Sequence, residues 1–519
     1  MSSRAQFATI LLSVSAVLAG CAPGLAANPQ FAVDNGHSGG GPGTTAPPPN
    51  GPPAIAAPKN DLSWRECTSR VFGDAALPAP PGITLDCATY DADLDPISGA
   101  TGTLTIGVVR ARSVQTPPDA GPLVFTTGSD LPTSVQLPVW LSRSGADILK
   151  SHPIVAVDRR GMGMSSAVDC RALFDRQEMR DQAQFESGDD PVANLGAVSM
   201  TATTSCTDTI APGDSAYDNA HAAEDIEKLR SIWDVPALAL VGIGNGSQVA
   251  LSYAGTHPDK VARLILDSPV PLGISAEGAA EQQVKGQQAA LDSFAAQCAA
   301  TNCPLGSDPK GAIDSLLAAA RNGNGPGGQS VAALVNAIVT ALAFPDGDRA
   351  TNTARLAGAL AAARDGDENQ LNNLIDQADT LQETDGQFIN RCSDSLNRPT
   401  PDRVRELVVA WGKLYPQFGT VAALNLVKCL NWPSGTAPDP PKNLKVDALL
   451  LGVQNDPIVG SEGVAATAAT IINAGSNSKR VMWQGIGHGA SIYTGCAMPP
   501  LIGYLDSGKT PDTDTFCPA

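Results

Sequence analysis

The sequence predicts an α/β protein with a mostly parallel, doubly wound sheet and a helical lid insertion. Short strands rich in β-branched residues alternate with helical stretches over most of the chain. The strands are continuous apolar runs, which is typical of parallel strands covered on both faces. Between about residues 275 and 440, long Ala- and Leu-rich helical stretches replace the strands. A sheet interrupted by one helical insertion accounts for all three observations.

The first 60 residues differ from the rest of the chain. Residues 1–20 carry one positive charge, at Arg4, before a short apolar run, which is typical of a secretory signal peptide. The run ends in LAGC, which resembles a bacterial lipobox with Cys21 as the lipidated residue; ordinary signal cleavage is the alternative. Residues 21–60 are dominated by Gly, Pro, Ala and Asn and predict a linker. Either interpretation predicts an exported chain, anchored to the membrane through Cys21 or secreted into the envelope.

The predicted α/β core has two parts, residues 61–272 and 441–519, separated by the lid at 273–440. Helices are expected at 218–235 and at about 245–257, on either side of a buried strand. The lid should cover the carboxyl ends of the strands, where the loops leave room for a ligand. Strands are expected at 102–112, 121–127, 153–158, 237–242, 262–268, 446–457 and 479–489.

Charge and metal-ligand spacing exclude several classes of partner. The formal net charge of the 519 residues is −18, and no Lys- or Arg-rich run is present. Neither a nucleic-acid-binding surface nor an anionic-membrane surface is therefore expected. The chain has no C-x-x-C pair, and its five histidines lack ligand spacing, so we expect neither zinc nor a cofactor.

The cysteines predict a disulfide framework. Setting Cys21 aside leaves ten of the eleven cysteines, and an even number in an exported chain is typical of disulfides. Pairing neighbours along the sequence gives five modest loops, while other connectivities stay open. The neighbouring pairs are Cys67 with Cys87, Cys170 with Cys206, Cys298 with Cys303, Cys392 with Cys429, and Cys496 with Cys517.

A Gly-rich turn between a predicted strand and helix raises the main functional question. In the nucleophile elbow G-x-S-x-G, the outer glycines let the strand reverse while the central serine stays exposed. Residues 242–246 are Gly-Ile-Gly-Asn-Gly, so the central residue is Gly244, which has no hydroxyl to form an acyl-enzyme. We interpret Gly244 as a vacated nucleophile position, beside which Asn245 still offers an oxyanion N–H.

Two other interpretations of this turn are weaker. Ser247 lies one helical turn further along, so its hydroxyl should be several Å away from the nucleophile position. Gly-x-Gly could also begin a dinucleotide fingerprint, but Ser247 replaces the third glycine, and an exported protein rarely meets NAD.

The other two members of a hydrolase triad are predicted downstream, in the expected chain order. Asp456 follows an apolar strand, at the edge of the sheet where active-site groups gather; a turn Asp before a proline is the alternative. His488 lies between two glycines after the last predicted strand, which leaves an imidazole accessible; a loop histidine without a role is the alternative.

These residues resemble a known family. The chain is similar to the exported tripeptidyl-aminopeptidase-like serine peptidases of actinobacteria, in the prolyl-aminopeptidase branch of the α/β-hydrolases, and to mycobacterial cell-envelope protease lipoproteins. The resemblance implies an α/β-hydrolase fold whose lid selects short peptides by their free N-terminus. It rests on VDRRG (157–161), HPDKVARLILDSPV (257–270), CPLG (303–306), the Asp456 and His488 loops, and the cysteine pattern from Cys67 to Cys517.

The chain departs from this family in two places. The family's G-x-S-Y-G is replaced by GIGNG, so the resemblance puts the nucleophile at Gly244. The family's oxyanion loop N-P-G-G-P-G-x-S-G is replaced by TTGSDLPTS at 126–134, where only Gly128 clearly remains. Each lost oxyanion donor costs about 2.7–4 kcal/mol of transition-state stabilisation. Two separate parts of the catalytic machinery are therefore altered.

The sequence thus predicts an exported, catalytically impaired homologue that binds a short peptide or a small ester or envelope ligand. The alternative is an active peptide or ester hydrolase that uses another nucleophile or a water activated by His488. Loss of a triad nucleophile leaves only roughly a thousandfold catalysis over water, so such activity should be weak. A purely structural envelope protein is the third possibility.

Overall fold

The computed structural model describes residues 52–183 and 188–519. The chain divides into two compact units, residues 1–50 and 51–519, and the described residues belong to the second. The predicted signal peptide, Cys21 and the linker up to residue 51 therefore lie outside the described residues.

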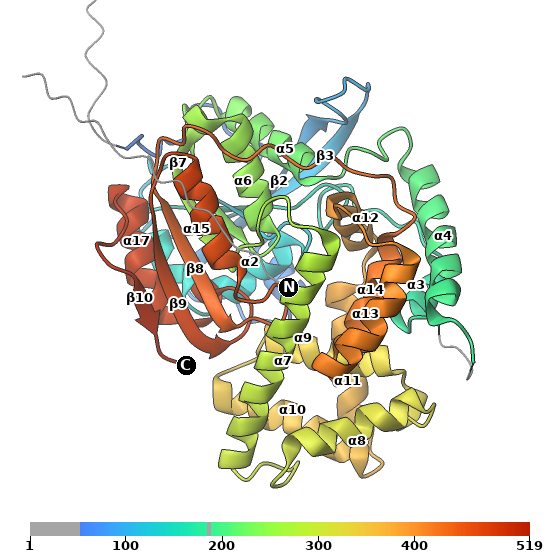
Figure 1. Cartoon of the computed structure of the whole chain (residues 1–519). Coiled ribbons are helices and arrows are strands. Elements are labelled where there is room, and N and C mark those ends of the chain that lie inside the picture. Colours follow the sequence, from blue (N-terminus) through green and yellow to red (C-terminus); the bar gives the residue numbers. More distant parts are fainter. Residues whose placement is uncertain (1–51, 184–187) are drawn as a thin grey trace, which may run out of the picture. The chain divides into compact units, whose positions relative to one another are not determined.

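Within the described residues, a ten-stranded sheet forms the centre of the unit, in the order β1-β2-β3-β5-β4-β6-β7-β8-β9-β10 (Figure 1). The pairs β1–β2, β2–β3 and β3–β5 are antiparallel, and every other neighbouring pair is parallel. The predicted fold class, a mostly parallel α/β sheet, is confirmed. The strands are β1 (Arg65–Glu66), β2 (Ile83–Asp93), β3 (Thr103–Ser113), β4 (Leu123–Thr126), β5 (Ile154–Val157), β6 (Leu238–Ile243), β7 (Val261–Asp267), β8 (Ala448–Asn455), β9 (Ser478–Ile486) and β10 (Thr515–Cys517).

Helices cover both faces of this sheet because alternate strand residues point to opposite sides. On β4, Phe125 packs edge-on against Trp140 of α2, with ring centroids 4.9 Å apart. Its neighbour Val124 lies in the opposite apolar cluster, with Ile226 of α5 and Val249 of α6. The first face carries α1 (Thr68–Asp74), α2 (Thr133–Leu141), α16 (Ala490–Tyr493) and α17 (Met498–Ser507), and the second carries α5 (Asn219–Trp233), α6 (Gly246–Thr256) and α15 (Gly463–Asn473).

The predicted lid is a helical segment with an apolar core, drawn yellow-green to orange in Figure 1. Leu291, Leu317, Ile338 and Leu360 come from four of its helices and are at most 1% exposed. The Ala- and Leu-rich helices therefore pack on one another and form an apolar core within the lid. The lid helices are α7 (Ala276–Ala300), α8 (Pro309–Arg321), α9 (Val331–Ala343), α10 (Arg349–Arg364), α11 (Asn369–Gln382), α12 (Asp385–Asp394), α13 (Pro401–Leu414) and α14 (Gly419–Asn425), followed by the 3₁₀ turn η4 (Leu426–Cys429).

Two further helices precede β6 and, like α1 and α2, were not predicted. They are α3 (Leu173–Arg180) and α4 (Pro191–Ile210). Asp190 caps the start of α4 by accepting hydrogen bonds from the backbone N–H groups of Val192 and Ala193. α4 packs against α13 and η4, so it supports the lid from the core side.

All five neighbouring cysteine pairs are disulfides, as the simplest pairing predicted. Each joins segments that are close in sequence, and together they brace the sheet edge, α4, α7, α12 and the C-terminus. The bonds are Cys67–Cys87, Cys170–Cys206, Cys298–Cys303, Cys392–Cys429 and Cys496–Cys517.

The end of the predicted linker packs on the core. The carbonyl oxygen of Pro53 accepts a hydrogen bond from Arg263 Nη1 (2.8 Å). Ile55 packs against the apolar cluster on the first face of the sheet, and Lys59 N donates to Trp233 O (2.9 Å). Residues 52–60 therefore belong with the core, although their composition predicted linker.

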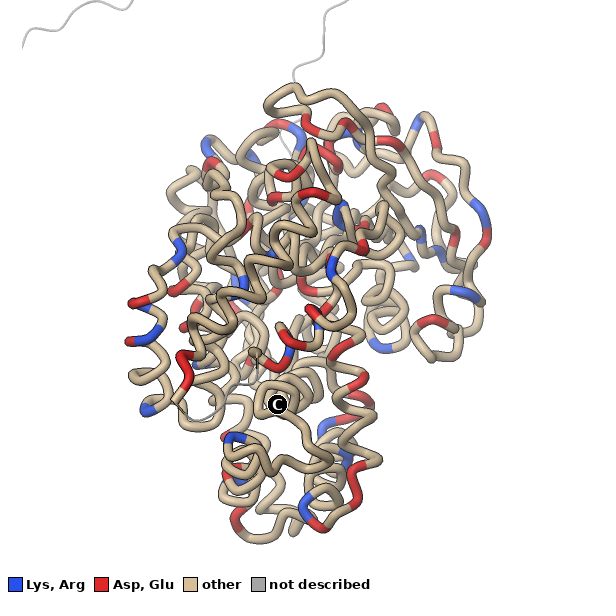
Figure 2. The backbone as a smooth tube through the Cα atoms, turned by 90° about the vertical axis from the view of Figure 1, so that its right-hand side faces the viewer, with Lys and Arg blue, Asp and Glu red and all other residues tan. Residues whose placement is uncertain are grey.

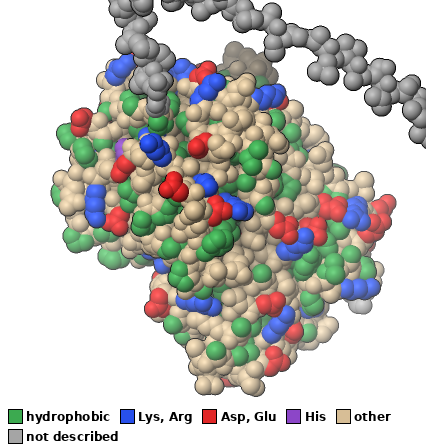
Figure 3. Space-filling view, turned by 60° about the vertical axis from the view of Figure 1, so that its left-hand side comes forward, with side chains coloured by type: hydrophobic (Ala, Val, Ile, Leu, Met, Phe, Trp, Pro, Cys, Tyr) green, Lys and Arg blue, Asp and Glu red, His purple; other side chains and the backbone are tan. Residues whose placement is uncertain are grey.

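The surface is mixed in charge and polarity. Figure 2 shows Lys and Arg interspersed with Asp and Glu along the chain, and Figure 3 shows apolar side chains scattered among polar ones on one face. None of the helices in residues 52–183 and 188–519 is both long and apolar enough to cross a bilayer.

Candidate active site

The turn between β6 and α6 has the geometry of a strand-to-helix elbow. Gly244 adopts φ +57°, and its N–H donates to Asp267 O (2.9 Å). The outer glycines are required by close packing, because a Cβ at Gly242 would overlap the carbonyl oxygen of Gly246, and one at Gly246 would overlap that of Thr126. The chain can reverse within three residues only because these positions lack side chains.

A side chain at Gly244 would point directly at His488. An ideal Cβ built on Gly244 would lie 2.5 Å from His488 Nε2 and would overlap Asp130 Oδ2. The position therefore faces the imidazole as a nucleophile would, but the space in front of it is filled by another residue.

Asp456 and His488 form the predicted acid–histidine pair. Asp456 directly follows β8, and its Oδ1 accepts the backbone N–H groups of Ile458 (2.9 Å) and Val459 (3.2 Å). His488 Nδ1 lies 3.0 Å from Asp456 Oδ2 and 3.1 Å from Oδ1. The lid also holds this loop, since His488 N donates to Ala343 O at the end of α9 (2.9 Å). The histidine is thus oriented as in a hydrolase triad.

Asp130 occupies the other side of the imidazole. Its Oδ2 lies 3.3 Å from His488 Nε2 and accepts the backbone N–H of Asn245 (2.7 Å), while its Oδ1 accepts from Asn245 Nδ2 (2.5 Å). The Asp130 residue is only 2% exposed. The predicted oxyanion donor Asn245 therefore binds a carboxylate of the protein itself.

Two carboxylates keep His488 protonated. Burial alone would lower the pKa of His488, but the charge of Asp456 and the hydrogen bond to Asp130 outweigh it and raise the pKa to about 10. Burial disfavours the charged form of Asp130 and would raise its pKa. The hydrogen bonds from His488 and Asn245 outweigh this effect and hold the pKa below the usual value. At neutral pH both ring nitrogens donate, so the imidazole has no lone pair with which to accept a proton.

Helix α12 of the lid fixes the main chain around Asp130. Gln387 Nε2 donates to Asp130 O (2.5 Å). Arg391 donates from Nε to Ser129 O (3.2 Å) and from Nη2 to Asp130 O (3.3 Å). The position of this carboxylate thus depends on the lid as well as on the core.

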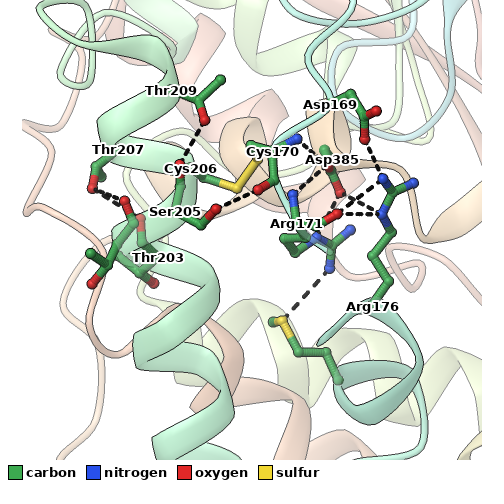
Figure 4. The surroundings of a disulfide bond; sticks show 12 residues. Asp169, Cys170, Arg171, Arg176, Thr203, Ser205, Cys206, Thr207, Thr209 and Asp385 are labelled. Carbon is green, nitrogen blue, oxygen red and sulfur yellow. Dashed lines mark hydrogen bonds and ion pairs between the residues drawn. A yellow bond between two sulfur atoms is a disulfide. The ribbon is translucent and has the colours of Figure 1, made fainter. Parts of the chain in front are cut away.

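A buried ion pair beside a disulfide anchors α12 to the core (Figure 4). Asp385, in the first turn of α12, accepts from Cys170 N (2.6 Å), Arg171 N (2.9 Å) and Arg171 Nε (2.7 Å). Cys170 is bonded to Cys206 of α4. The charge near a helix N-terminus also suits the helix dipole. Core, α4 and α12 are therefore tied together at one point.

Two other predicted residues have structural contacts. Ser247 is buried, and its Oγ donates to Gly244 O (2.6 Å) and accepts from Val270 N (3.0 Å), so it stabilises the elbow. Gly128, with φ +59°, donates its N–H to Thr126 Oγ1 (3.2 Å), within its own loop. A Cβ on Gly128 would overlap the backbone of Asn245. In this conformation Gly128 contributes close packing, and its N–H is already engaged.

A cavity of about 320 Å³ lies between the core and the lid. Asp130 and Asn245 line it, together with residues of α7, α9, α12 and α14, whereas Gly244 and His488 do not. Asp130 therefore separates the imidazole from the cavity. The described residues contain no group of three or more His, Cys, Asp or Glu side chains placed to hold a metal ion.

Asp130 is the site residue that the sequence did not single out. It lies in TTGSDLPTS, the stretch already noted for its lost glycines. The available signal was an acidic residue at the carboxyl end of a strand, but only the pairing of β4 with β6 shows that this loop faces the elbow.

Comparisons with known proteins agree with this architecture. Residues 415–517 match a family model described as TAP-like protein. Serine protease Hip1 of Mycobacterium tuberculosis strain H37Rv is 24% identical over 265 residues, and the Mycobacterium bovis protein of that name matches equally. The match covers 50% of this chain, and the chain spans about half the length of these curated relatives.

Solved structures give weak likenesses. Esterase E22 has a TM-score of 0.41 at 12% identity, over 81% of this chain and 99% of that chain. A probable hydrolytic enzyme from Pseudomonas aeruginosa PAO1 has a TM-score of 0.35 at 12% identity, over 82% of this chain and 94% of that chain.

The doubly covered parallel sheet, the glycine elbow and the paired Asp456 and His488 agree with the family match at the C-terminal part of the chain. The chain has the α/β-hydrolase fold, and its C-terminal part resembles TAP-like proteins.

Proposed function

We propose that this chain is an exported α/β-hydrolase homologue that binds a short peptide or a small ester or envelope ligand without cleaving it by a serine mechanism. Gly244 is then a vacated nucleophile position. Export is supported by the signal-like N-terminus, the lipobox ending at Cys21 and the five disulfides, since disulfides persist in oxidising compartments.

One observation carries this proposal: the Asp130 carboxylate lies where a nucleophile oxygen would lie. It contacts His488 Nε2 at 3.3 Å and the oxyanion donor Asn245 N–H at 2.7 Å. A serine mechanism needs a neutral imidazole and an empty oxyanion site. Asp130 removes both conditions. Its charge favours the protonated imidazole, and its carboxylate already accepts the Asn245 N–H that would bind the oxyanion.

The test is labelling with a fluorophosphonate probe in four proteins. The unmodified chain should stay unlabelled, and Gly244→Ser should also stay unlabelled, because its Cβ overlaps Asp130. The double variant Gly244→Ser/Asp130→Ala removes the overlap with Asp130 and leaves room for the His488 ring to shift away from the new side chain, so it should gain labelling. Adding His488→Ala should abolish the gain. Labelling of the unmodified chain at any serine, with turnover of a peptide or ester, would overturn the proposal.

A second candidate function is hydrolysis of a small ester with Asp130 as the nucleophile. It is favoured by the contact of Asp130 with both the cavity and His488. The carboxylate would form an acyl anhydride, His488 would give its proton to the departing alcohol, and water would then hydrolyse the anhydride. Incorporation of ¹⁸O from labelled water into Asp130 during turnover, detected by peptide mass spectrometry, would support this route. Absence of turnover with the cavity occupied excludes it.

A further inference from the structure

The cavity between core and lid is lined mainly by uncharged groups. Eight of its lining residues are Asn or Gln, and one, Phe388, is aromatic. The lining contains three cations and three anions, so its formal charges cancel. The cations are Arg171, Arg391 and Lys428, and the anions are Asp130, Glu383 and Asp394.

The protein already engages each of these charges. Arg391 donates to the carbonyl oxygens of Ser129, Gln382 and Asp130. A charged ligand group would have to compete with an existing partner or lose its own hydration without replacement, which is costly in a buried site. The ion pairs are Arg171–Asp385 (2.7 Å), Arg159–Asp394 (2.7 Å), Lys428–Glu383 (3.5 Å) and His488–Asp130 (3.3 Å).

The groups that stay free are neutral. Gln287 of α7 is 7% exposed and Thr340 of α9 is 2% exposed, and neither side chain has a hydrogen-bond partner among the described residues. Gln382 accepts from Arg391 at Oε1 (2.8 Å), while its buried Nε2 has no acceptor in the described part of the chain. Buried polar groups are normally paired, so these three side chains point to a ligand that supplies the partners.

The geometry points to the uncharged backbone of a short peptide, with internal or blocked ends, as the occupant of this cavity. An amide side chain offers one acceptor and donors, which match the N–H and C=O of a peptide group. Val270, Ile274 and Val339 supply apolar surface for peptide side chains. This specificity differs from recognition of a free N-terminus, and it rests on the proposed binding function.

A saccharide fits the lining less well. Sugar rings commonly pack on a free aromatic face, and Phe388 is already in edge contact with Trp432 (centroids 5.5 Å apart) and under Arg171 (4.8 Å). The volume of about 320 Å³ lies at the lower end of the range for small-ligand sites, about 300–1,000 Å³. A peptide of a few small residues matches both features.

The test is calorimetric titration of the full chain with four probes: acetyl-trialanine amide, acetyl-trialanine, free trialanine and maltotriose. We expect the blocked amide to bind most tightly and free trialanine to bind at least about tenfold more weakly, because its ends bring unpaired charges into the cavity. Equal or tighter binding of free trialanine, or of maltotriose, overturns the inference but leaves the binding proposal intact. No binding of any probe at millimolar concentration overturns the inference as well, whereas fluorophosphonate labelling of the unmodified chain is what defeats the proposed function.

Matched variants locate the binding. Gln287→Met keeps the volume but removes the free amide, and Thr340→Val keeps the shape but removes the free hydroxyl. Each should weaken binding of acetyl-trialanine amide about fivefold or more, because a ligand group is left unpaired. Gln370→Met, at an exposed position of α11, should leave binding unchanged. Unchanged affinity in both cavity variants, with unfolding temperatures equal to that of the unmodified chain, overturns the inference.

Discussion

Gly244 and Asp130 are structurally coupled, because they compete for one volume beside His488. Any Cβ at 244 overlaps Asp130 Oδ2 and would lie 2.5 Å from His488 Nε2, so a side chain there requires both groups to shift. Residues in contact give non-additive effects when they are changed. Restoring a serine at the elbow therefore requires a second change at 130, and a single substitution should strain the site.

The protonation of His488 makes stability depend on pH. The pKa of His488 is raised to about 10, by carboxylates that outweigh the opposing effect of burial, from about 6.5 in an unfolded chain. A raised pKa contributes stability that is complete below pH 6.5 and is lost as pH rises through 10. We expect the difference in free energy of unfolding between the unmodified chain and His488→Gln to be largest near pH 6 and to shrink steadily toward pH 10. Urea unfolding at several pH values measures it.

The conservative variant Asp130→Asn is the control for this titration. It keeps one of the two oxygen acceptors that Asp130 offers to Asn245 but removes one of the two charges that raise the pKa of His488. The loss of stability should begin near pH 6.5 in both proteins, but it should end at a lower pH and be smaller in total in Asp130→Asn, because only the folded-state pKa of His488 is lowered. A pH profile that Asp130→Asn leaves unaltered would mean that Asp130 does not set the protonation of His488.

At the scale of elements, the buried parallel strands were the most predictable part. β6 and β7 are buried at every residue, and their mostly apolar sequences predicted them to within one residue. The positions of the Asp456 and His488 loops followed from two later strands, because Asp456 lies just beyond β8 and His488 just beyond β9.

β2 was missed because its stability depends on a partner strand. It pairs with β3 over its whole length, but its sequence ITLDCATYDAD contains three aspartates. Asp86 is buried there because Arg110 and Arg112 of β3 donate to it. Such cross-strand pairs exist only after folding, and the same is true of the Asp130 contacts, which need β4 beside β6.

The first turn of α12 should be a sensitive anchor of the lid. Asp385 is buried and accepts hydrogen bonds from Arg171 and from two backbone N–H groups. Removing one partner of a buried ion pair commonly costs about 3–5 kcal/mol. We expect Asp385→Asn to lower the free energy of unfolding by that amount, measured by denaturant titration. Asp365→Asn, which affects an exposed pair with Arg364, should leave stability unchanged, and equal effects of the two variants would contradict the anchor role.

At the scale of the whole molecule, the lid and the sheet share one site rather than stacking as independent layers. Gln387 and Arg391 of the lid hold Asp130, and Ala343 of the lid holds the His488 loop. A movement of α12 would therefore disturb both the cavity lining and the carboxylate beside the imidazole. Ligand binding under the lid and the protonation of His488 should be thermodynamically linked.

The boundary of the folded unit can be tested by truncation. Composition predicts that the linker extends to residue 60, whereas residues 52–60 pack on the core and Pro53 O accepts from the buried Arg263. Burial lowers the pKa of Arg263, and a hydrogen bond to a charged group contributes about 1.5–3 kcal/mol. A chain of residues 51–519 should match the full chain in denaturant unfolding, whereas 61–519 should lose about that amount. Equal stability of both truncations would place residues 52–60 in the linker after all.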